Sequence, residues 1–568
     1  MNSTLQVIFG LLGGLAVFIF GMNMMSECLQ KVAGEKMKSV LALLTKNPIL
    51  GVIAGALTTA VLQSSSATTV MAIGFVSAGL MTLPQAISII LGANIGTTMT
   101  AQIIAFKISD YIYIIVFIGF IVSFVAKSER VKNIGQTIFA FGLLFVGIET
   151  MGDVMKPLAS SPVFTDLIGQ VAHIPVLGVA VGTLMTLVVQ SSSATIAVLQ
   201  NFASQAGPDG VTSMLGLTGA IPILLGDNIG TTITAILASI GQSKDAKRTA
   251  VAHCIFNISG CLLFIWFIKP FAALIRYISP KGVEIEVISR QIANAHTTFN
   301  ITMTLLWIPL IWLMVKIVMR VIPEGKSVAL DESMPLYLDD NLVGQPAAAL
   351  QLVAKEVLHC GDVVGELLVD TTTAIEREDK DLMTAIVEKA ERARALHGKI
   401  TDYLTDLFAS GVLTEEQATQ TAGLMYVLSD VDRMGSLCRD MTLFMQEKKE
   451  KKQKYSKEAM DDLEKSLKMI EDMYSETMQV MATGSQENAK KILKRKEKVL
   501  DLDIKIRKAH VERVGKGKCS AKMTASFNKI LHIIDRMSNS CVNIADAALG
   551  QLDFTYFLPK EEELEVSE

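Results

Sequence analysis

Long apolar runs in the first 322 residues constrain the fold of this chain more than any other feature. They approach the roughly 17 to 25 residues that a helix needs to cross a bilayer. The runs lie at residues 5–28, 84–105, 111–126, 134–152, 212–240, 250–275 and 290–321. The first run lacks the basic start of a signal peptide, so we interpret it as a retained span. The sequence therefore predicts an all-α, polytopic membrane protein.

The charged residues are concentrated in the second part of the chain. Residues 1–322 contain 18 Lys and Arg and 12 Asp and Glu, whereas residues 323–568 contain 34 and 44. We expect a membrane domain over 1–322, a linker at 323–345, a soluble helical domain at 346–552 and a disordered acidic tail at 553–568. The seven cysteines show no metal-ligand or redox spacing, which favours a reducing compartment for the soluble part.

Two stretches interrupt the apolar sequence with hydroxyl and amide side chains. They are LQSSSATTV at 62–70 and VQSSSATIA at 189–197. The apolar segments on either side, about 14 and about 13 residues long, are too short to cross a bilayer singly. Irregular backbone is tolerated at membrane depth only against protein or water. We therefore predict two re-entrant helix hairpins, each with a polar turn at its tip.

These motifs belong to an internal duplication. Three signals recur in the same order: FGMNMM at 20–25 and VGIETM at 146–151, QSSSAT at 63–68 and 190–195, and GANIGTT at 92–98 and GDNIGTT at 226–232. We expect repeat one over about 5–126, repeat two over about 134–275 and an extra span at 290–321. Because each repeat then holds an odd number of crossings, the two copies are inverted and their hairpin tips can meet near the midplane.

The basic residues of short loops predict the orientation in the membrane. Three loops placed in the cytoplasm carry Lys31, Lys36, Lys38 and Lys46, then Lys127, Arg130 and Lys132, then Lys244, Lys247 and Arg248. We therefore expect a multi-pass protein of the inner or plasma membrane. Its N-terminus would lie outside and its C-terminal domain in the cytoplasm.

The polar tips suggest transport of an anion together with cations. Broken helices that converge at mid-membrane in an inverted repeat are typical of secondary transporters. Serine hydroxyls and free N–H groups at a helix start favour an oxyanion. Neither motif contains Arg or Lys, so bound cations would balance the anion, and the oxygens of the NIGTT segments suit hard cations. The alternative, close packing of small residues, is disfavoured by the duplication.

Other intramembrane polar residues leave alternatives open. Asp227 has Ala93 as its counterpart, and it is either a cation or proton site or a carboxylate paired to a neighbouring helix. AHCIFN at 252–257 and AHTTFN at 295–300 place His and Asn four apart, which favours hydrogen bonds between helices. The chain has no Walker A or HExxH sequence and no plausible nucleophile with partners, so we do not expect an enzyme.

The repeated motifs resemble those of a known family. The paired QSSS motifs, GANIGTT, GDNIGTT and AHCIFNISGCLL are similar to the type II sodium-dependent phosphate cotransporters, specifically bacterial members with a soluble extension. The resemblance covers essentially all of residues 1–322 and implies inorganic phosphate and sodium as cargo, with no organic cofactor. It implies phosphate binding by Gln63, Ser64, Ser65, Ser66, Gln190, Ser191, Ser192 and Ser193. For sodium we select Thr68, Asn94, Thr97, Thr98, Thr195, Asn228, Thr231 and Thr232.

The soluble part is similar to PhoU, a helical regulator linked to phosphate uptake. The resemblance rests on LHCGDVVGELL at 358–368, SDVDRMGSLCRDM at 429–441 and LHIIDRMSNSCVNIADAAL at 531–549. Helical periodicity predicts two three-helix bundles from six helices, at about 346–376, 380–410, 415–448, 456–483, 485–514 and 520–551. Ser436 and Asn539 stand where the family usually has Asp, which argues against its metal clusters. An acidic metal-binding patch or ordinary solvated faces are the alternatives for Asp362, Glu366, Asp432 and Asp535.

Together these observations predict sodium-coupled transport of inorganic phosphate across the cytoplasmic membrane by alternating access, with the PhoU-like domain as a candidate regulator. The alternatives are a phosphate exporter and a phosphate sensor that does not transport. The expected partners are the lipid bilayer, phosphate and sodium, and a homo-oligomer is a candidate assembly. A nucleic acid is not expected, because the lysine-rich segment at 447–458 lacks interleaved aromatics and lies in an acidic domain.

Overall fold

The computed structural model divides into two compact units, Met1–Gly325 and Lys326–Glu568. The residues that it describes are 3–42, 47–106, 108, 111–159, 174–207, 209–323, 333–451 and 455–550. Throughout these residues the secondary structure is helical, apart from one β-bridge between Ala206 and Ser213. The all-α prediction is thus confirmed. The expected acidic tail lies outside the described residues.

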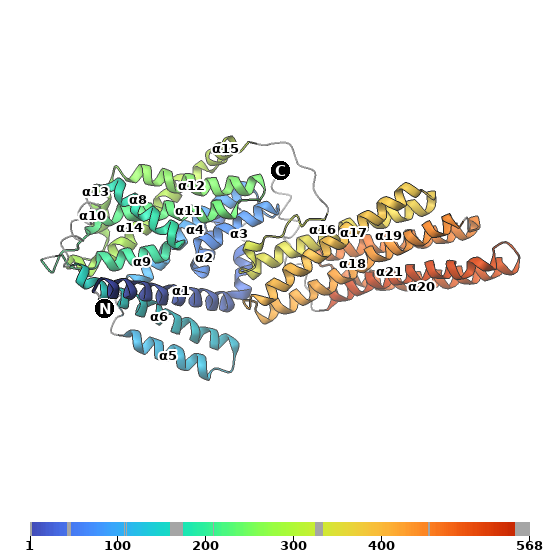
Figure 1. Cartoon of the computed structure of the whole chain (residues 1–568), viewed down its shortest axis with the longest axis horizontal. Coiled ribbons are helices and arrows are strands. Elements are labelled where there is room, and N and C mark those ends of the chain that lie inside the picture. Colours follow the sequence, from blue (N-terminus) through green and yellow to red (C-terminus); the bar gives the residue numbers. More distant parts are fainter. Residues whose placement is uncertain are drawn as a thin grey trace. The chain divides into compact units, whose positions relative to one another are not determined.

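The first unit contains the helices of the predicted membrane domain (Figure 1). They are α1 (Ser3–Ala42), α2 (Pro48–Leu62), α3 (Ser65–Ser77), α4 (Leu83–Ile104), α5 (Ile112–Val125), α6 (Glu129–Ala159), α8 (Pro175–Val189), α9 (Ser192–Ala203), α10 (Gly216–Gly230), α11 (Thr232–Ala238), α12 (Lys244–Phe264), α13 (Ile268–Ile278), α14 (Glu284–Trp307), η3 (Ile308–Leu310) and α15 (Ile311–Val321). α6 packs between α1 and α5.

Several helical segments of the described chain are long and apolar enough to cross a membrane. They are Gln6–Val32, Leu83–Ile104, Glu129–Val154, Gly216–Ala238 and Glu284–Val321. The segment 250–275, predicted as one crossing, is not one continuous helix, because α12 and α13 are bent by 94°. Its crossing of the membrane stays a prediction. Pro270 lies in the first turn of α13, where its missing N–H costs little, whereas in an unbroken helix it would lose the hydrogen bond to residue 266 and its ring would clash with that carbonyl. The chain therefore turns although its hydropathy stays high.

Each QSSS stretch forms a turn between two short helices. α2 and α3, of 15 and 13 residues, meet at Gln63 and Ser64. α8 and α9, of 15 and 12 residues, meet at Gln190 and Ser191. None of the four reaches the roughly 17 residues of a full span. The helix–turn–helix shape is as expected, and its re-entry into a bilayer stays a prediction.

Glycines bring the backbone of each hairpin against the helix that carries NIGTT. A β-carbon on Gly92 of α4 would overlap the carbonyl oxygen of Val52 on α2. In the second repeat, a β-carbon on Gly226 of α10 would overlap the carbonyl oxygen of Val179 on α8. Small residues of this kind allow close approach of helices in membranes. The first leg of each hairpin and the following helix therefore form matching, tightly packed pairs.

The two-fold correspondence also includes α12 and α14. α12 packs on α3 and α4 of the first repeat and on α10 of the second, and α14 packs correspondingly on α9 and α10 of the second repeat and on α4 of the first. We infer that α14, which was expected within an extra span, is the counterpart of α12. The helix α5 packs on α6. AHCIFN and AHTTFN are 43 residues apart, whereas the other repeated motifs are 126 to 134 residues apart. The correspondence between α12 and α14 therefore cannot be recognised from the spacing of motifs in the sequence.

The second unit consists of two three-helix bundles, as predicted. Its helices are η4 (Asp340–Leu342), α16 (Pro346–Arg377), α17 (Lys380–Ala409), α18 (Glu415–Glu450), α19 (Lys457–Thr483), α20 (Gln486–Gly515), η5 (Ala521–Met523) and α21 (Thr524–Leu549). α16, α17 and α18 pack together, as do α19, α20 and α21. The bundles are joined by contacts of α16 with α19 and of α18 with α21.

Residues 333–345, expected in the linker, pack on the first of these bundles. Leu342 is fully buried. The Tyr403 hydroxyl on α17 donates a hydrogen bond of 2.9 Å to the carbonyl oxygen of Asp339. The N–H of Tyr337 donates one of 2.6 Å to Oε2 of Glu356 on α16. This part of the expected linker is therefore a structural component of the soluble unit.

Glu356 should make the stability of this unit depend on pH. It is fully buried, and burial raises the pKa of its carboxyl from 4.5 to about 7, against the lowering effect of three backbone N–H groups. Between these pH values the folded state retains a proton that the unfolded state releases, so stability falls as pH rises, by up to about 3 kcal/mol. We expect Glu356→Gln to remove this slope in thermal unfolding of the full chain between about pH 5 and about pH 7. Equal slopes for the two proteins would contradict this assignment.

Candidate functional site

The tips of both hairpins have strained backbone at a glutamine. Gln63 has φ of 51° and Gln190 has φ of 54°, the left-handed region that non-glycine residues rarely adopt. Among the described residues that are not glycine, only Glu378 shares a positive φ. Glycine would relieve the strain, so we infer that the amide side chain matters at both tips.

A serine caps the second leg of each hairpin. Ser64 Oγ accepts the N–H of Ala67 at 3.2 Å, and Ser191 Oγ accepts the N–H of Ala194 at 3.3 Å. α3 and α9 therefore begin at the tips, where the first N–H groups of a helix lack intrahelical partners and the helix dipole is positive. Both tips consequently present an environment that favours an anion.

Hydroxyl groups from both repeats donate hydrogen bonds to side chains of the first motif. Thr100 Oγ1 on α4 donates to Gln63 Oε1 at 3.0 Å. Thr234 Oγ1, on α11 of the second repeat, donates to Ser66 Oγ at 3.0 Å. Ser65 is buried, whereas Gln63 and Ser66 are half-buried. The structure thus places the first motif against the second repeat.

The second motif is more accessible than the first. Gln190 is exposed, Ser191 and Ser192 are half-buried and Ser193 is buried. Its helix α9 packs on α4 of the first repeat, which corresponds to the contact of α3 with α11. The helix that begins at each motif therefore contacts the NIGTT-bearing helix of the opposite repeat, or the helix that directly follows it.

A pair of buried threonines bridges the two legs of each hairpin. Thr59 Oγ1 lies 2.8 Å from Thr68 Oγ1, and Thr186 Oγ1 lies 3.0 Å from Thr195 Oγ1. Thr68 and Thr195 were predicted site residues, but their partners were missed. The signal was present, since Thr59 and Thr186 are separated by the same 127 residues as the two QSSS motifs.

Asp227 distinguishes the second repeat from the first. Its carboxyl is fully buried, and Thr186 donates to Oδ1 at 2.6 Å. Oδ2 is buried without a hydrogen-bond partner in the described residues. The threonine pair of the second repeat therefore has a carboxyl group as a hydrogen-bond acceptor, whereas the first repeat has Ala93 at the corresponding position.

The asparagines of the NIGTT segments each face a histidine. Asn94 and Asn228 are buried, and their Oδ1 atoms lie 3.4 Å from His253 Nε2 and 3.3 Å from His296 Nε2 respectively. The predicted hydrogen bonding of the His–Asn helices to other helices is confirmed. Each threonine hydroxyl of these segments donates to a backbone carbonyl three or four residues earlier in the chain, which leaves its oxygen able to accept: Thr97, Thr98, Thr231 and Thr232.

The four acidic candidates of the soluble unit lie on three helices. Asp362 and Glu366 are on α16, Asp432 is on α18 and Asp535 is on α21. Glu366 forms an ion pair of 2.7 Å with Lys389. No group of three or more His, Cys, Asp or Glu in the described chain is placed to hold a metal ion.

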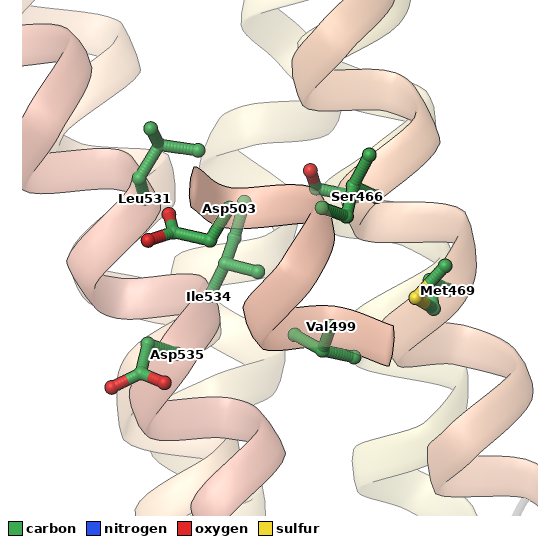
Figure 2. Close-up of a pocket in the computed structure, with 8 residues that line it drawn as sticks. Ser466, Met469, Val499, Asp503, Leu531, Ile534 and Asp535 are labelled. Atoms are coloured by element: carbon green, nitrogen blue, oxygen red, sulfur yellow. The ribbon is translucent and has the colours of Figure 1, made fainter. Parts of the chain in front are cut away.

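Asp535 lines a small cavity between α19, α20 and α21 (Figure 2). Asp503 and Ser466 line the same cavity. Its volume of about 10 Å³ is at the lower limit for one water molecule. Since Lys496 donates to Asp535 Oδ1 at 2.6 Å, this carboxylate already has a cationic partner.

Known protein families match parts of both units. The Na+/Pi-cotransporter family matches residues 17–153 and 151–279, and the PhoU domain matches residues 357–444 and 463–548. The Bacillus subtilis "Uncharacterized protein YqeW" is 33% identical over 263 residues, which cover 46% of this chain and 83% of that protein. The chain belongs to the Na/Pi cotransporter family. This membership supports phosphate transport as its activity, and the second unit is its PhoU domain.

Other relatives of this Na/Pi cotransporter family member carry descriptive names. "Putative inorganic phosphate export protein YjbB" of Salmonella typhimurium is 24% identical over 555 residues, which cover 96% of this chain and 97% of that protein. Human "Sodium-dependent phosphate transport protein 2B" is 39% identical over 97 residues, 17% of this chain and 14% of that protein. No solved structure matches the chain.

Proposed function

We propose that this protein transports inorganic phosphate together with sodium by alternating access between its two repeats. The observation that carries the proposal is the pair of hairpin tips, each with a left-handed glutamine, a capping serine and a helix N-terminus. The bond from Thr234 to Ser66 joins one tip to the opposite repeat. Movement of one repeat relative to the other would therefore change the first tip directly.

Phosphate binds, in this proposal, at the donor groups of the two tips. The residues are Gln63, Ser64, Ser65, Ser66, Gln190, Ser191, Ser192 and Ser193. Hydroxyl, amide and backbone N–H donors can satisfy the oxygens of phosphate without an Arg or Lys. The anionic charge is then balanced by the cations that bind with it.

Sodium binds, in this proposal, at the oxygens behind the tips. The residues are Thr68, Asn94, Thr97, Thr98, Thr195, Asn228, Thr231 and Thr232, with Asp227 added in the second repeat. Because Asp227 offers a free carboxyl oxygen, the second repeat should hold its cation more strongly than the first. Binding of anion and cation then becomes mutually dependent, as coupled transport requires.

Export of phosphate is the second candidate function. It is supported by the name of YjbB, which matches over 96% of this chain. A coupled carrier runs down the sum of its gradients, so the same site serves either direction. In both cases we propose a location in the inner or plasma membrane, with the N-terminus outside and the PhoU domain in the cytoplasm as a regulator.

Uptake of radiolabelled phosphate into proteoliposomes tests the proposal. We expect accumulation when an inward sodium gradient is imposed and none when potassium replaces sodium. Asp227→Ala, which gives the second repeat the residue of the first, should require a higher sodium concentration for half-maximal uptake. Binding of phosphate without accumulation in either direction would instead identify a sensor, and accumulation independent of sodium would exclude sodium coupling.

A further inference from the structure

Two matching sets of buried polar side chains connect the NIGTT helices to α12 and α14. In the first set, Asn94 faces His253, and Asn257 lies one turn beyond that histidine. In the second, Asn228 faces His296, and Asn300 follows in the same way. All six side chains are buried, the histidines completely.

The hydrogen bonds fix the orientation of each amide. Asn94 Nδ2 donates to the carbonyl of Ile90 at 2.8 Å, and Asn228 Nδ2 donates to that of Leu224 at 3.0 Å. A carbonyl oxygen only accepts, so Nδ2 must face it and Oδ1 must face the histidine. Because an amide oxygen also only accepts, Nε2 of the histidine must carry the hydrogen.

This arrangement leaves one lone pair on each amide oxygen. An amide oxygen has two acceptor directions, and the histidine occupies one of them. The histidine also resists rotation of the amide, so the second lone pair has a fixed direction. Outer groups of this kind orient the ligands of metal ions and tune their affinity.

A purely structural role accounts less well for these histidines. Burial of an imidazole carries a desolvation cost that an apolar side chain in the same place would avoid. The same three residue types nevertheless occur with the same bonds in both halves of the first unit. In both halves, moreover, the histidine's backbone carbonyl accepts the Asn257 or Asn300 amide at 3.0 Å.

We propose that His253 and His296 are positioning residues for sodium, which hold Asn94 and Asn228 in the orientation that binds the cation. The inference rests on the proposed function, because it takes these asparagines as sodium ligands. It adds that α12 and α14 take part in cation binding through one hydrogen bond each. It also predicts a specific chemical requirement, a donor at the position of Nε2.

Matched substitutions separate this requirement from simple packing. In His253→Gln the amide Nε2 can reach the position of the imidazole Nε2, whereas in His253→Asn the shorter side chain cannot. The same pair is made at His296. The measurement is phosphate uptake in proteoliposomes, with the sodium concentration for half-maximal uptake and the phosphate KM at saturating sodium determined separately.

We expect the Asn variants to need about tenfold more sodium, as loss of a buried hydrogen bond implies, with an unchanged phosphate KM. The Gln variants should restore the sodium dependence of the parent protein. Equal sodium dependence of the Asn and Gln variants would overturn the inference. If the Asn variants do not fold, the Gln variants decide the question. A tenfold higher sodium concentration for half-maximal uptake in the Gln variants overturns the inference, and the same concentration as in the parent protein supports it. A parent protein without sodium dependence would instead refute the proposed function.

Discussion

Replacement of both Ser65 and Ser192 by alanine should abolish sodium-driven phosphate uptake while the protein remains folded in the membrane. Each change removes a hydroxyl donor from the first turn of a half-helix at a hairpin tip. Hydrogen bonds to charged groups contribute about 1.5 to 3 kcal/mol each, so loss of two weakens phosphate binding by about a hundredfold or more. Uptake at low phosphate, measured with protein of confirmed monodispersity, checks this.

Ser123→Ala is the matched control for the double variant. Ser123 lies on α5, away from the hairpins, and its hydroxyl donates to the Phe120 carbonyl of the same helix at 2.9 Å. Its uptake should equal that of the parent protein. If the double variant at the tips transported as well as this control, the assigned phosphate site would be wrong.

Valine at Gly92 or at Gly226 should prevent formation of a stable transporter. A β-carbon at either position overlaps a backbone carbonyl of the neighbouring hairpin leg, and neither backbone can move without separating the two helices. Overpacking a well-packed core costs about 1 to 3 kcal/mol. Here the obstacle is a backbone rather than a side chain, so the cost should exceed that range. Thermal unfolding of the purified protein measures the loss.

Gly13→Val provides the control for these two variants. Gly13 is also within an apolar helix, but a β-carbon there meets nothing within 4 Å. Its melting temperature should stay close to that of the parent protein. Equal stability of Gly92→Val and Gly13→Val would show that the hairpin and α4 are not in the tight contact described above.

The sequence was informative where local pattern determines structure. Helical periodicity located the six long helices of the PhoU domain within a few residues of their observed ends, because each buries one apolar face along its length. The lengths of the apolar segments around Gln63 and Gln190 predicted two short legs and a turn. Repetition of the motifs also identified both tips as candidate site residues.

Features that depend on contacts between distant residues could not be predicted in this way. The bond from Thr234 to Ser66 joins residues 168 positions apart, and nothing in either segment indicates its partner. The bond from Tyr337 to Glu356 likewise attaches a segment that appears in the sequence as a linker. Mean hydropathy over 250–275 does not include the effect of Pro270 on the backbone, so the bend between α12 and α13 was not predicted.

The number of phosphate ions bound per chain tests most directly whether the two tips share one site. It can be measured by equilibrium binding of radiolabelled phosphate to the purified protein in saturating sodium, for the parent protein, Ser65→Ala and Ser192→Ala. A shared site predicts one phosphate per chain and severe loss of affinity in each single variant. Two phosphates per chain, of which each variant retains one, would show that the hairpins bind separately and would contradict the account.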